Sequence, residues 1–88
     1  MQTILNGISV EQEEKIHSIL QIMADKYSRE LLRITRDLPK SASSIAQETE
    51  IPISTVYRRI QKLQGIGIVR VSGEINLEGK KHFLYHSK

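Results

Sequence analysis

The sequence contains no cysteine. Disulfides, thiolate metal sites and thiol nucleophiles are therefore excluded together, which is compatible with a reducing compartment. No run approaches the roughly 18 consecutive apolar residues of a membrane span. Residues 1–15, MQTILNGISVEQEEK, lack the basic flank and apolar run of a signal peptide. We therefore expect a cytoplasmic protein that does not bind a membrane.

The sequence also lacks the patterns of common enzymes and metal sensors. It has no phosphate-binding glycine loop and no nucleophile with a recognisable base. His82 and His86 would lie about 13 Å apart along one strand, too far to chelate one ion within a subunit, and His17 stands alone. We predict no enzymatic activity, no metal site and no cofactor. A metal site shared between subunits and RNA binding stay open.

The chain is short, and its charge is unevenly distributed. Eighty-eight residues suffice for one domain with a modest core. Residues 1–25 carry one lysine against four acids, which gives them a net charge of −3. Because the whole chain has a net charge of +3, residues 26–88 have a net charge of +6. A basic majority favours a polyanionic partner, although a few surplus lysines on a small protein would give the same total.

Residues 10–24 are predicted to form the first helix. Ser9 and Gln12 have the spacing of a capping box, and acids follow in the first turns, where the helix dipole favours them. One apolar stripe of this helix consists of Ile16, Ile19, Leu20 and Met23. The stripe either packs on its own domain or contacts a second copy of the chain.

Three further helices are expected. Asp25 can cap a helix over residues 26–37, which Pro39 would end because the residue before a proline is pushed out of the helical region. Ser41 can cap a short third helix, and residues 53–64 form the fourth, ended by two glycines. The short link between the last two helices has the outline of a helix-turn-helix.

The pattern changes to strand beyond these glycines. Residues 68–72 are rich in β-branched side chains and predict one strand, residues 73–79 predict a loop, and residues 81–86 predict a returning strand. The predicted fold class is therefore mainly α with a small β-hairpin at its C-terminal end.

The helix over residues 53–64 has two different faces. At about 100° per residue, Val56, Ile60 and Leu63 fall on one side of the helical wheel and form a buried face. The opposite face has no acid and consists of Ser54, Tyr57, Arg58 and Gln61. Because arginine can pair with guanine or phosphate and glutamine with adenine, this face favours DNA contact over an ordinary basic surface or a protein interface.

The run IAQETEIPISTVYRRIQKLQGIGIVRV is similar to the winged helix-turn-helix of ArsR- and MarR-like transcription regulators, especially the compact forms common in archaea. DKYSRELLRI resembles the helix that precedes the motif in those proteins. The resemblance implies one winged helix-turn-helix domain over residues 1–88, with helices followed by a two-stranded wing. Residues 10–24 would be an extra N-terminal helix, and residues 25–86 the DNA-binding module.

The resemblance also implies which residues contact DNA. Helix 53–64 would be the recognition helix in the major groove, and residues 68–86 would form the wing on the DNA backbone. The residues nearest the bases would be Ser54, Thr55, Tyr57, Arg58 and Gln61. Backbone contacts would come from Arg59 and Lys62 on the same helix, Ser43 and Ser44 on the preceding helix, and Arg70, Lys80 and Lys81 on the wing.

Four residues depart from the family pattern. Glu50 stands where a residue suited to the turn, often glycine, is common. Pro52 replaces a hydroxyl cap, a role that Ser54 could take over in part. Glu74 and Glu78 make the wing loop acidic, which argues against deep insertion of its tip into a groove of DNA.

These observations predict a sequence-specific duplex-DNA-binding transcription regulator. One module touches a short site, so useful specificity requires two copies on a twofold-related operator, and the N-terminal stripe is the expected homodimer contact. The alternative is a winged helix that serves as a protein adaptor in a larger complex and binds a partner through that stripe. The sequence names no small-molecule effector.

Overall fold

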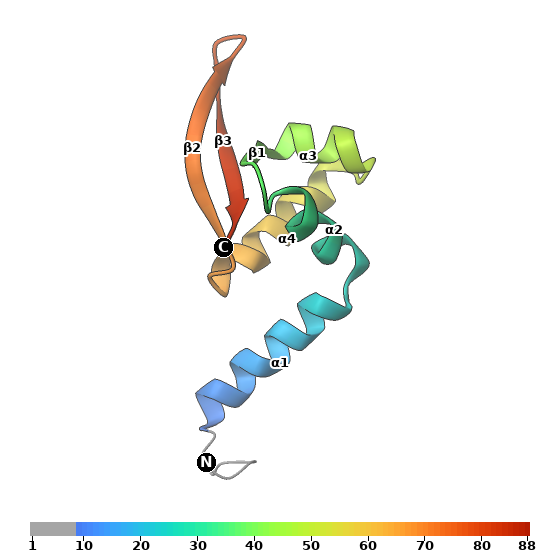
Figure 1. Cartoon of the computed structure of the whole chain (residues 1–88), viewed down its shortest axis with the longest axis vertical. Coiled ribbons are helices and arrows are strands. Elements are labelled where there is room, and N and C mark those ends of the chain that lie inside the picture. The colour runs from blue at the N-terminus through green and yellow to red at the C-terminus, as the bar shows by residue number, and fades with distance from the viewer. Residues whose placement is uncertain (1–8) are drawn as a thin grey trace.

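A computed structural model describes residues 9–88, which form four helices and a three-stranded antiparallel sheet (Figure 1). The elements are α1 (Val10–Ala24), α2 (Lys26–Ile34), β1 (Lys40–Ser41), α3 (Ala42–Thr49), α4 (Ile53–Gly65), β2 (Val69–Leu77) and β3 (Lys80–Ser87). The predicted fold class of four helices with a C-terminal hairpin is confirmed, although the short strand β1 interrupts the predicted order between α2 and α3. The N-terminal segment 1–15, in which we expect no signal peptide, lies mostly outside the described residues.

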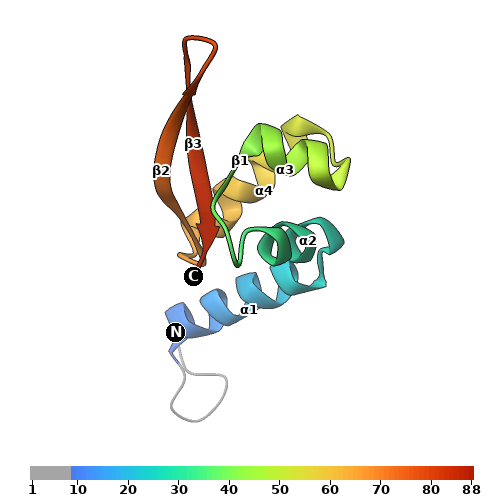
Figure 2. The same cartoon turned by 45° about the horizontal axis from the view of Figure 1, so that its top comes forward.

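α1 begins at the predicted capping box. The Ser9 hydroxyl accepts a hydrogen bond from the Gln12 backbone N–H, and the Gln12 side chain accepts one from the Ser9 N–H. α1 lies below the other helices in Figure 1 and passes beneath α2 in the turned view of Figure 2. Ile22 is its buried residue, so α1 meets the body along a narrow strip.

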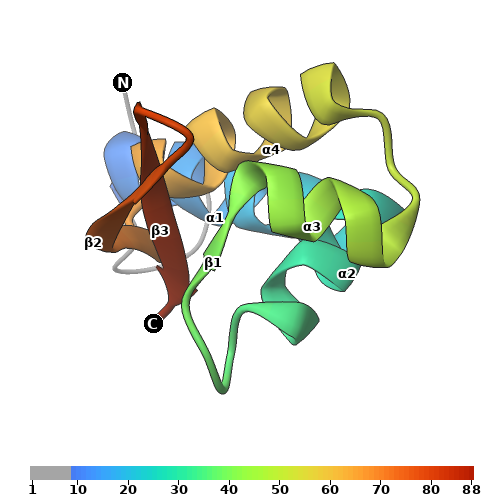
Figure 3. The same cartoon turned by 90° about the horizontal axis from the view of Figure 1, so that it is seen from above.

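The core lies mainly between the three remaining helices and the base of the sheet, with Ile22 of α1 at its edge, and Figure 3 shows these helices grouped beside the hairpin. Val56, Ile60 and Leu63 on α4 are fully buried, as their spacing predicts. Leu31 from α2 and Ile45 from α3 pack in the same cluster. Burying side chains of this size contributes about 1.5–3 kcal/mol each, so this contact fixes which face of α4 points outward.

α2 ends earlier than predicted. The helix stops at Ile34, and the buried Thr35 that follows donates its hydroxyl to a carbonyl of the preceding turn (2.9 Å). The Thr35 hydroxyl also lies 2.6 Å from the Ser87 hydroxyl, and the Thr35 carbonyl accepts from the Ser87 N–H. Pro39 lies well beyond this point and does not end the helix. The helix ends where Thr35 forms hydrogen bonds with the end of β3.

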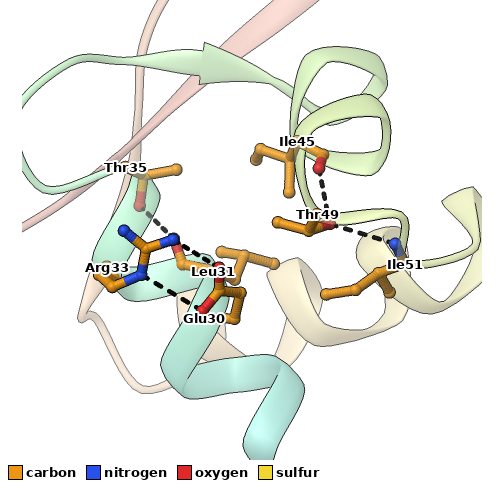
Figure 4. A network of polar contacts seen from close by, with 7 residues as sticks. All are labelled: Glu30, Leu31, Arg33, Thr35, Ile45, Thr49 and Ile51. Carbon is orange, nitrogen blue, oxygen red and sulfur yellow. Dashed lines mark hydrogen bonds and ion pairs between the residues drawn. The ribbon is translucent and has the colours of Figure 1, made fainter.

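A threonine side chain closes the turn between α3 and α4. The Thr49 hydroxyl donates to the Ile45 carbonyl (2.7 Å) and accepts from the Ile51 N–H (3.2 Å), as drawn in Figure 4. Glu50 lies between these residues in the left-handed conformation, with φ of 61°. Glu50 therefore occupies a backbone conformation that glycine adopts without steric cost, and the turn places Ile51 in the core.

The hairpin is longer and its loop shorter than predicted. β2 continues through most of the expected loop, and Leu77 pairs with Lys80. Glu78 and Gly79 alone form the turn, both with positive φ (53° and 76°), as in a type I′ turn. Gly73, which was expected in the loop, lies within β2 next to a shift in register.

The sheet has a third strand that the sequence did not predict. β1 pairs antiparallel with β3, with Lys40 opposite Tyr85 and Ser41 opposite Leu84. The strand order is therefore β1-β3-β2. A strand of two residues is too short to give an alternating pattern. This pairing holds the start of α3 beside the base of the wing.

We expect Glu50→Gly to leave the free energy of unfolding unchanged or to raise it by up to about 1.5 kcal/mol. The left-handed conformation costs an L-residue about 1–2 kcal/mol, and the greater chain entropy of glycine offsets about 0.5–1 kcal/mol of that gain. Urea denaturation measures the difference. Glu50→Ala is the control, because it removes the carboxylate but keeps Cβ. A glycine variant less stable than the alanine variant would contradict this account.

Candidate nucleic-acid interface

The face of α4 that was predicted to contact DNA is exposed to solvent. Ser54, Tyr57, Arg58 and Gln61 are exposed, while the opposite face is buried in the core. The start of α4 has no side-chain cap, because Pro52 occupies the cap position and no side chain bonds there. Ser54 therefore does not take over the capping role. Backbone N–H groups at an uncapped helix start are suited to an anion.

Several cations that were predicted to contact DNA have no acidic partner within residues 9–88. The ion pairs formed there involve other arginines and lysines. The unpaired cations of the predicted set are Arg58, Lys62, Arg70 and Lys80, and all four are exposed. Their charges are therefore available to a polyanion.

The wing carries both an ion pair and exposed apolar side chains. Lys81 lies 3.4 Å from Glu74 across the hairpin, with both side chains more than half exposed. An exposed pair of this kind contributes about 0–1 kcal/mol, so Lys81 can exchange its partner for a phosphate. The sequence analysis did not single out the exposed apolar residues of the wing, which are Val71, Ile75, Leu77 and Phe83.

The first turn of α3 contains Ser43 and Ser44, as predicted, but they differ in availability. Ser43 is exposed. Ser44 donates its N–H to the Ser41 hydroxyl (3.1 Å) and its own hydroxyl to Glu48 (3.0 Å). Glu48 also pairs with Lys40 (3.0 Å), whose hydrogen bond lowers the pKa of Glu48. The groups of Ser44 that were expected to bind phosphate therefore have partners within the protein.

Arg59, which was expected to face the DNA phosphates, is bound within the protein. Its Nε and Nη2 atoms donate to the two carboxylate oxygens of Asp25, at 2.7 and 3.3 Å. Its guanidinium carbon lies 5.9 Å from the centroid of the Tyr27 ring. The predicted role of Asp25 as the cap of α2 is confirmed, because its carboxylate accepts from the N–H and hydroxyl of Ser28. The bond to Arg59 is an additional role that the sequence did not predict.

The apolar stripe of α1 remains largely uncovered. Ile16, Leu20 and Met23 are 45%, 62% and 45% exposed, and Ile19 is partly buried. Ile22, beside the stripe, is the residue that packs on the body. Its own domain therefore covers the stripe only in part.

Comparison with known proteins defines the family. Residues 23–72 match the model of a family described as a helix-turn-helix domain. The chain belongs to this helix-turn-helix family. The two helices of its motif are α3 and α4, and β2 and β3 form the wing. No curated protein gives a significant match to the chain.

Solved structures share the fold of this helix-turn-helix protein at low sequence identity. An ArsR-like transcriptional regulator from Rhodococcus sp. RHA1 is 18% identical, with a TM-score of 0.70, over 92% of this chain and 70% of that chain. Reduced HlyU from Vibrio cholerae N16961 is 18% identical, with a TM-score of 0.70, over 89% and 77%. The homodimeric winged helix-turn-helix DNA-binding domain of Mb0332 from Mycobacterium bovis is 15% identical, with a TM-score of 0.68, over 94% and 75%. These similarities confirm the predicted winged helix-turn-helix fold class.

Two further observations concern the described part of this helix-turn-helix protein. Among residues 9–88, no helix is long and apolar enough to cross a membrane. In the same part of the chain, no group of three or more histidine, aspartate or glutamate residues lies close enough together to hold a metal ion.

Asp25 is held in its ionised form by its neighbours. Burial opposes ionisation of this carboxyl group, but hydrogen bonds from Arg59 and Ser28 outweigh it and lower the pKa from 3.8 to about 2. Because the folded pKa lies below the unfolded value, the stabilisation is present above about pH 4 and is lost as the pH falls through about 2.

We expect this group to lower the free energy of unfolding by about 1–2 kcal/mol between about pH 4 and pH 2, with allowance for its partial exposure. Asp25→Asn should flatten that part of the stability curve, as measured by urea denaturation at each pH. Glu30→Gln is the control, because Glu30 pairs with Arg33 on the exposed side of α2. A curve for Asp25→Asn that parallels the wild-type curve would contradict the assignment.

Proposed function

We propose that the chain is a sequence-specific duplex-DNA-binding transcription regulator. The observation that carries the proposal is the exposed, acid-free face of α4 on a helix-turn-helix whose opposite face is fully buried. Membership of a helix-turn-helix family and the fold shared with ArsR-like regulators support it. We include in the proposal the finer relationship to compact archaeal regulators of ArsR and MarR type, and a cytoplasmic location.

In this proposal α4 enters the major groove and reads bases. A major groove about 12 Å wide admits one helix. Arg58 offers a planar fork that matches the two acceptors of guanine, and Gln61 can pair with adenine. The remaining base contacts come from Ser54, Thr55 and Tyr57.

Other residues bind the phosphates and supply affinity that depends on salt. These residues are Ser43 on α3, Lys62 on α4, and Arg70, Lys80 and Lys81 on the wing. Two members of the predicted set, Ser44 and Arg59, are left out of this proposal, because groups within the protein already bind them.

We further propose that residues 1–88 act as one domain and bind a twofold-related operator as a homodimer. The contact is the α1 stripe of Ile16, Ile19, Leu20 and Met23, three of which are at least 45% exposed. A similar protein, the Mb0332 domain, is described as homodimeric. Burying these side chains against a second copy would remove the largest apolar side chains of α1 from water.

Arg58→Ala is expected to weaken binding to an operator selected from a random library by about 1–3 kcal/mol, and to weaken binding to random duplex DNA less. Lys80→Ala should weaken binding to all sequences alike and reduce the slope of log K against log salt by about 1. Fluorescence anisotropy over a salt series measures both effects. Arg33→Ala is the control, because Arg33 lies on α2, outside the proposed interface. Equal losses from Arg58→Ala on both DNAs would contradict base reading by Arg58.

A protein adaptor is the second candidate function. The wing favours it, because its exposed surface includes Ile75, Leu77 and Phe83, together with two acids. If the folded wild-type chain bound no duplex DNA at low salt, the regulator proposal would fail, and the adaptor would become the better hypothesis.

Leu20→Glu is expected to yield a folded monomer, because it places a charge in the centre of the proposed dimer contact, where burial of an unpaired charge is costly. Analytical ultracentrifugation measures the mass, and circular dichroism checks the fold. Gln21→Glu is the control, since it adds the same charge beside the stripe. A Leu20→Glu variant that stays dimeric would exclude this contact.

A further inference from the structure

Asp25 is the single residue between α1 and α2, and it contacts three helices. Its N–H donates to the Ile22 carbonyl at the end of α1 (3.0 Å). Its carboxylate accepts from Ser28 at the start of α2 and from Arg59 on α4. One residue therefore joins the N-terminal helix, the second helix and the recognition helix.

Other contacts at this junction point the same way. The Arg29 guanidinium on α2 donates to the Met23 carbonyl in the last turn of α1 (2.7 Å). The guanidinium of Arg59 lies over Tyr27 in the first turn of α2. Asp25 and Arg59 are 30% and 22% exposed, so their attraction is less screened by water than that of a surface pair.

Beyond the junction, few contacts join α1 to α4, and Ile22 is the residue of α1 that is buried in the core with side chains of α4. A groove of about 610 Å³ separates them, with Ser18 and Gln21 on one side and Lys62 and Gly65 on the other. α1 packs chiefly against α2. The direction of α1 relative to α4 therefore depends on a small number of contacts, of which the bond between Asp25 and Arg59 is the charged one that reaches α4.

We propose that Asp25 is a positioning residue that fixes the direction of α1 relative to α4 and, in a dimer, the separation of the two recognition helices. The inference rests on the proposed function, in which α1 forms the dimer contact and α4 reads DNA. A change in the angle between these helices moves the two copies of α4 relative to each other, and so changes the half-site spacing that the dimer accepts. In this proposal Arg59 helps to fix the direction of α1 through its bond to Asp25, and it does not bind a DNA phosphate.

The cap of α2 and the ion pair can be separated chemically. The variant Asp25→Asn still offers a side-chain oxygen to the start of α2, but carries no charge for Arg59. Arg59→Gln removes the pair from the other side and leaves the cap intact. A change that both variants share is therefore caused by loss of the link and not by loss of the cap, and either variant serves if the other fails to fold.

The first experiment measures the geometry without DNA. Because the chain has no cysteine, His17→Cys on α1 and Gln64→Cys on α4 direct nitroxide labels to two exposed positions only. Dipolar electron paramagnetic resonance of labelled protein diluted into unlabelled protein then reports the distance within one chain. We expect one narrow distribution in the labelled parent, and a shifted or broader one after either Asp25→Asn or Arg59→Gln. Distributions that do not change would overturn the proposal.

The second experiment uses operators whose two selected half-sites are separated by spacers that differ by one base pair. We expect the affinity ratio between the best and the next spacer to fall about three- to tenfold in both variants, from the usual size of coupling between contacting residues. Binding to a single half-site should persist. A half-site loss as large as the loss on the full operator would make Arg59 a DNA contact and overturn the proposal.

A matched control and a double variant complete the design. Glu30→Gln removes a carboxylate that pairs with Arg33 on α2 without reaching α4, so spacer preference should be retained. The double variant of Asp25 and Arg59 should lose no more preference than either single variant, because the same link is removed. If the wild-type chain bound no duplex, the proposed function would fail, while the distance measurement would still decide whether Asp25 sets the direction of α1.

Discussion

The burial of one face of α4 is the constraint on which the rest of the molecule depends. Val56, Ile60 and Leu63 leave water completely and pack against α2 and α3. Because residues on a helix are separated by about 100°, fixing these three side chains also fixes the direction of every other side chain on α4. The core therefore defines which face of α4 is exposed to solvent.

The parts of the fold that the sequence predicted are those with strong local signals. The capping box at Ser9 and the apolar spacing of α4 lie within one or two helical turns, so they can be seen in a short window of sequence. The end of α2, the strand β1 and the tight turn of the wing could not be predicted in the same way. Thr35 is bound by Ser87, and β1 is defined by its pairing with β3, so both depend on residues 43 to 52 positions away. The turn places Glu78 at positive φ, which is uncommon for that residue.

In the candidate interface, too, the residues that local spacing predicts differ from those that depend on distant partners. Tyr57, Arg58 and Gln61 were predicted to be exposed because they lie opposite the apolar face, and they are. Arg59 lies on the flank of the helix, where the helical wheel cannot decide between solvent and a neighbouring helix. Its partner is 34 positions earlier in the chain, and Asp25 already had a sufficient explanation as a helix cap. Because Asp25 was already explained as a helix cap, its second contact, with Arg59, became evident only in the folded chain.

The unequal length of the strands gives the wing a gradient of stiffness. β1 pairs only with the part of β3 near Tyr85 and Leu84, so the sheet has three strands at its base and two beyond it. Two-stranded ribbons twist more strongly and are only marginally stable when they are not packed, and the residues of β2 beyond Val69 are all exposed. Beyond its base the hairpin therefore lacks the packing that would resist bending, and we expect its tip to deform more easily than its base.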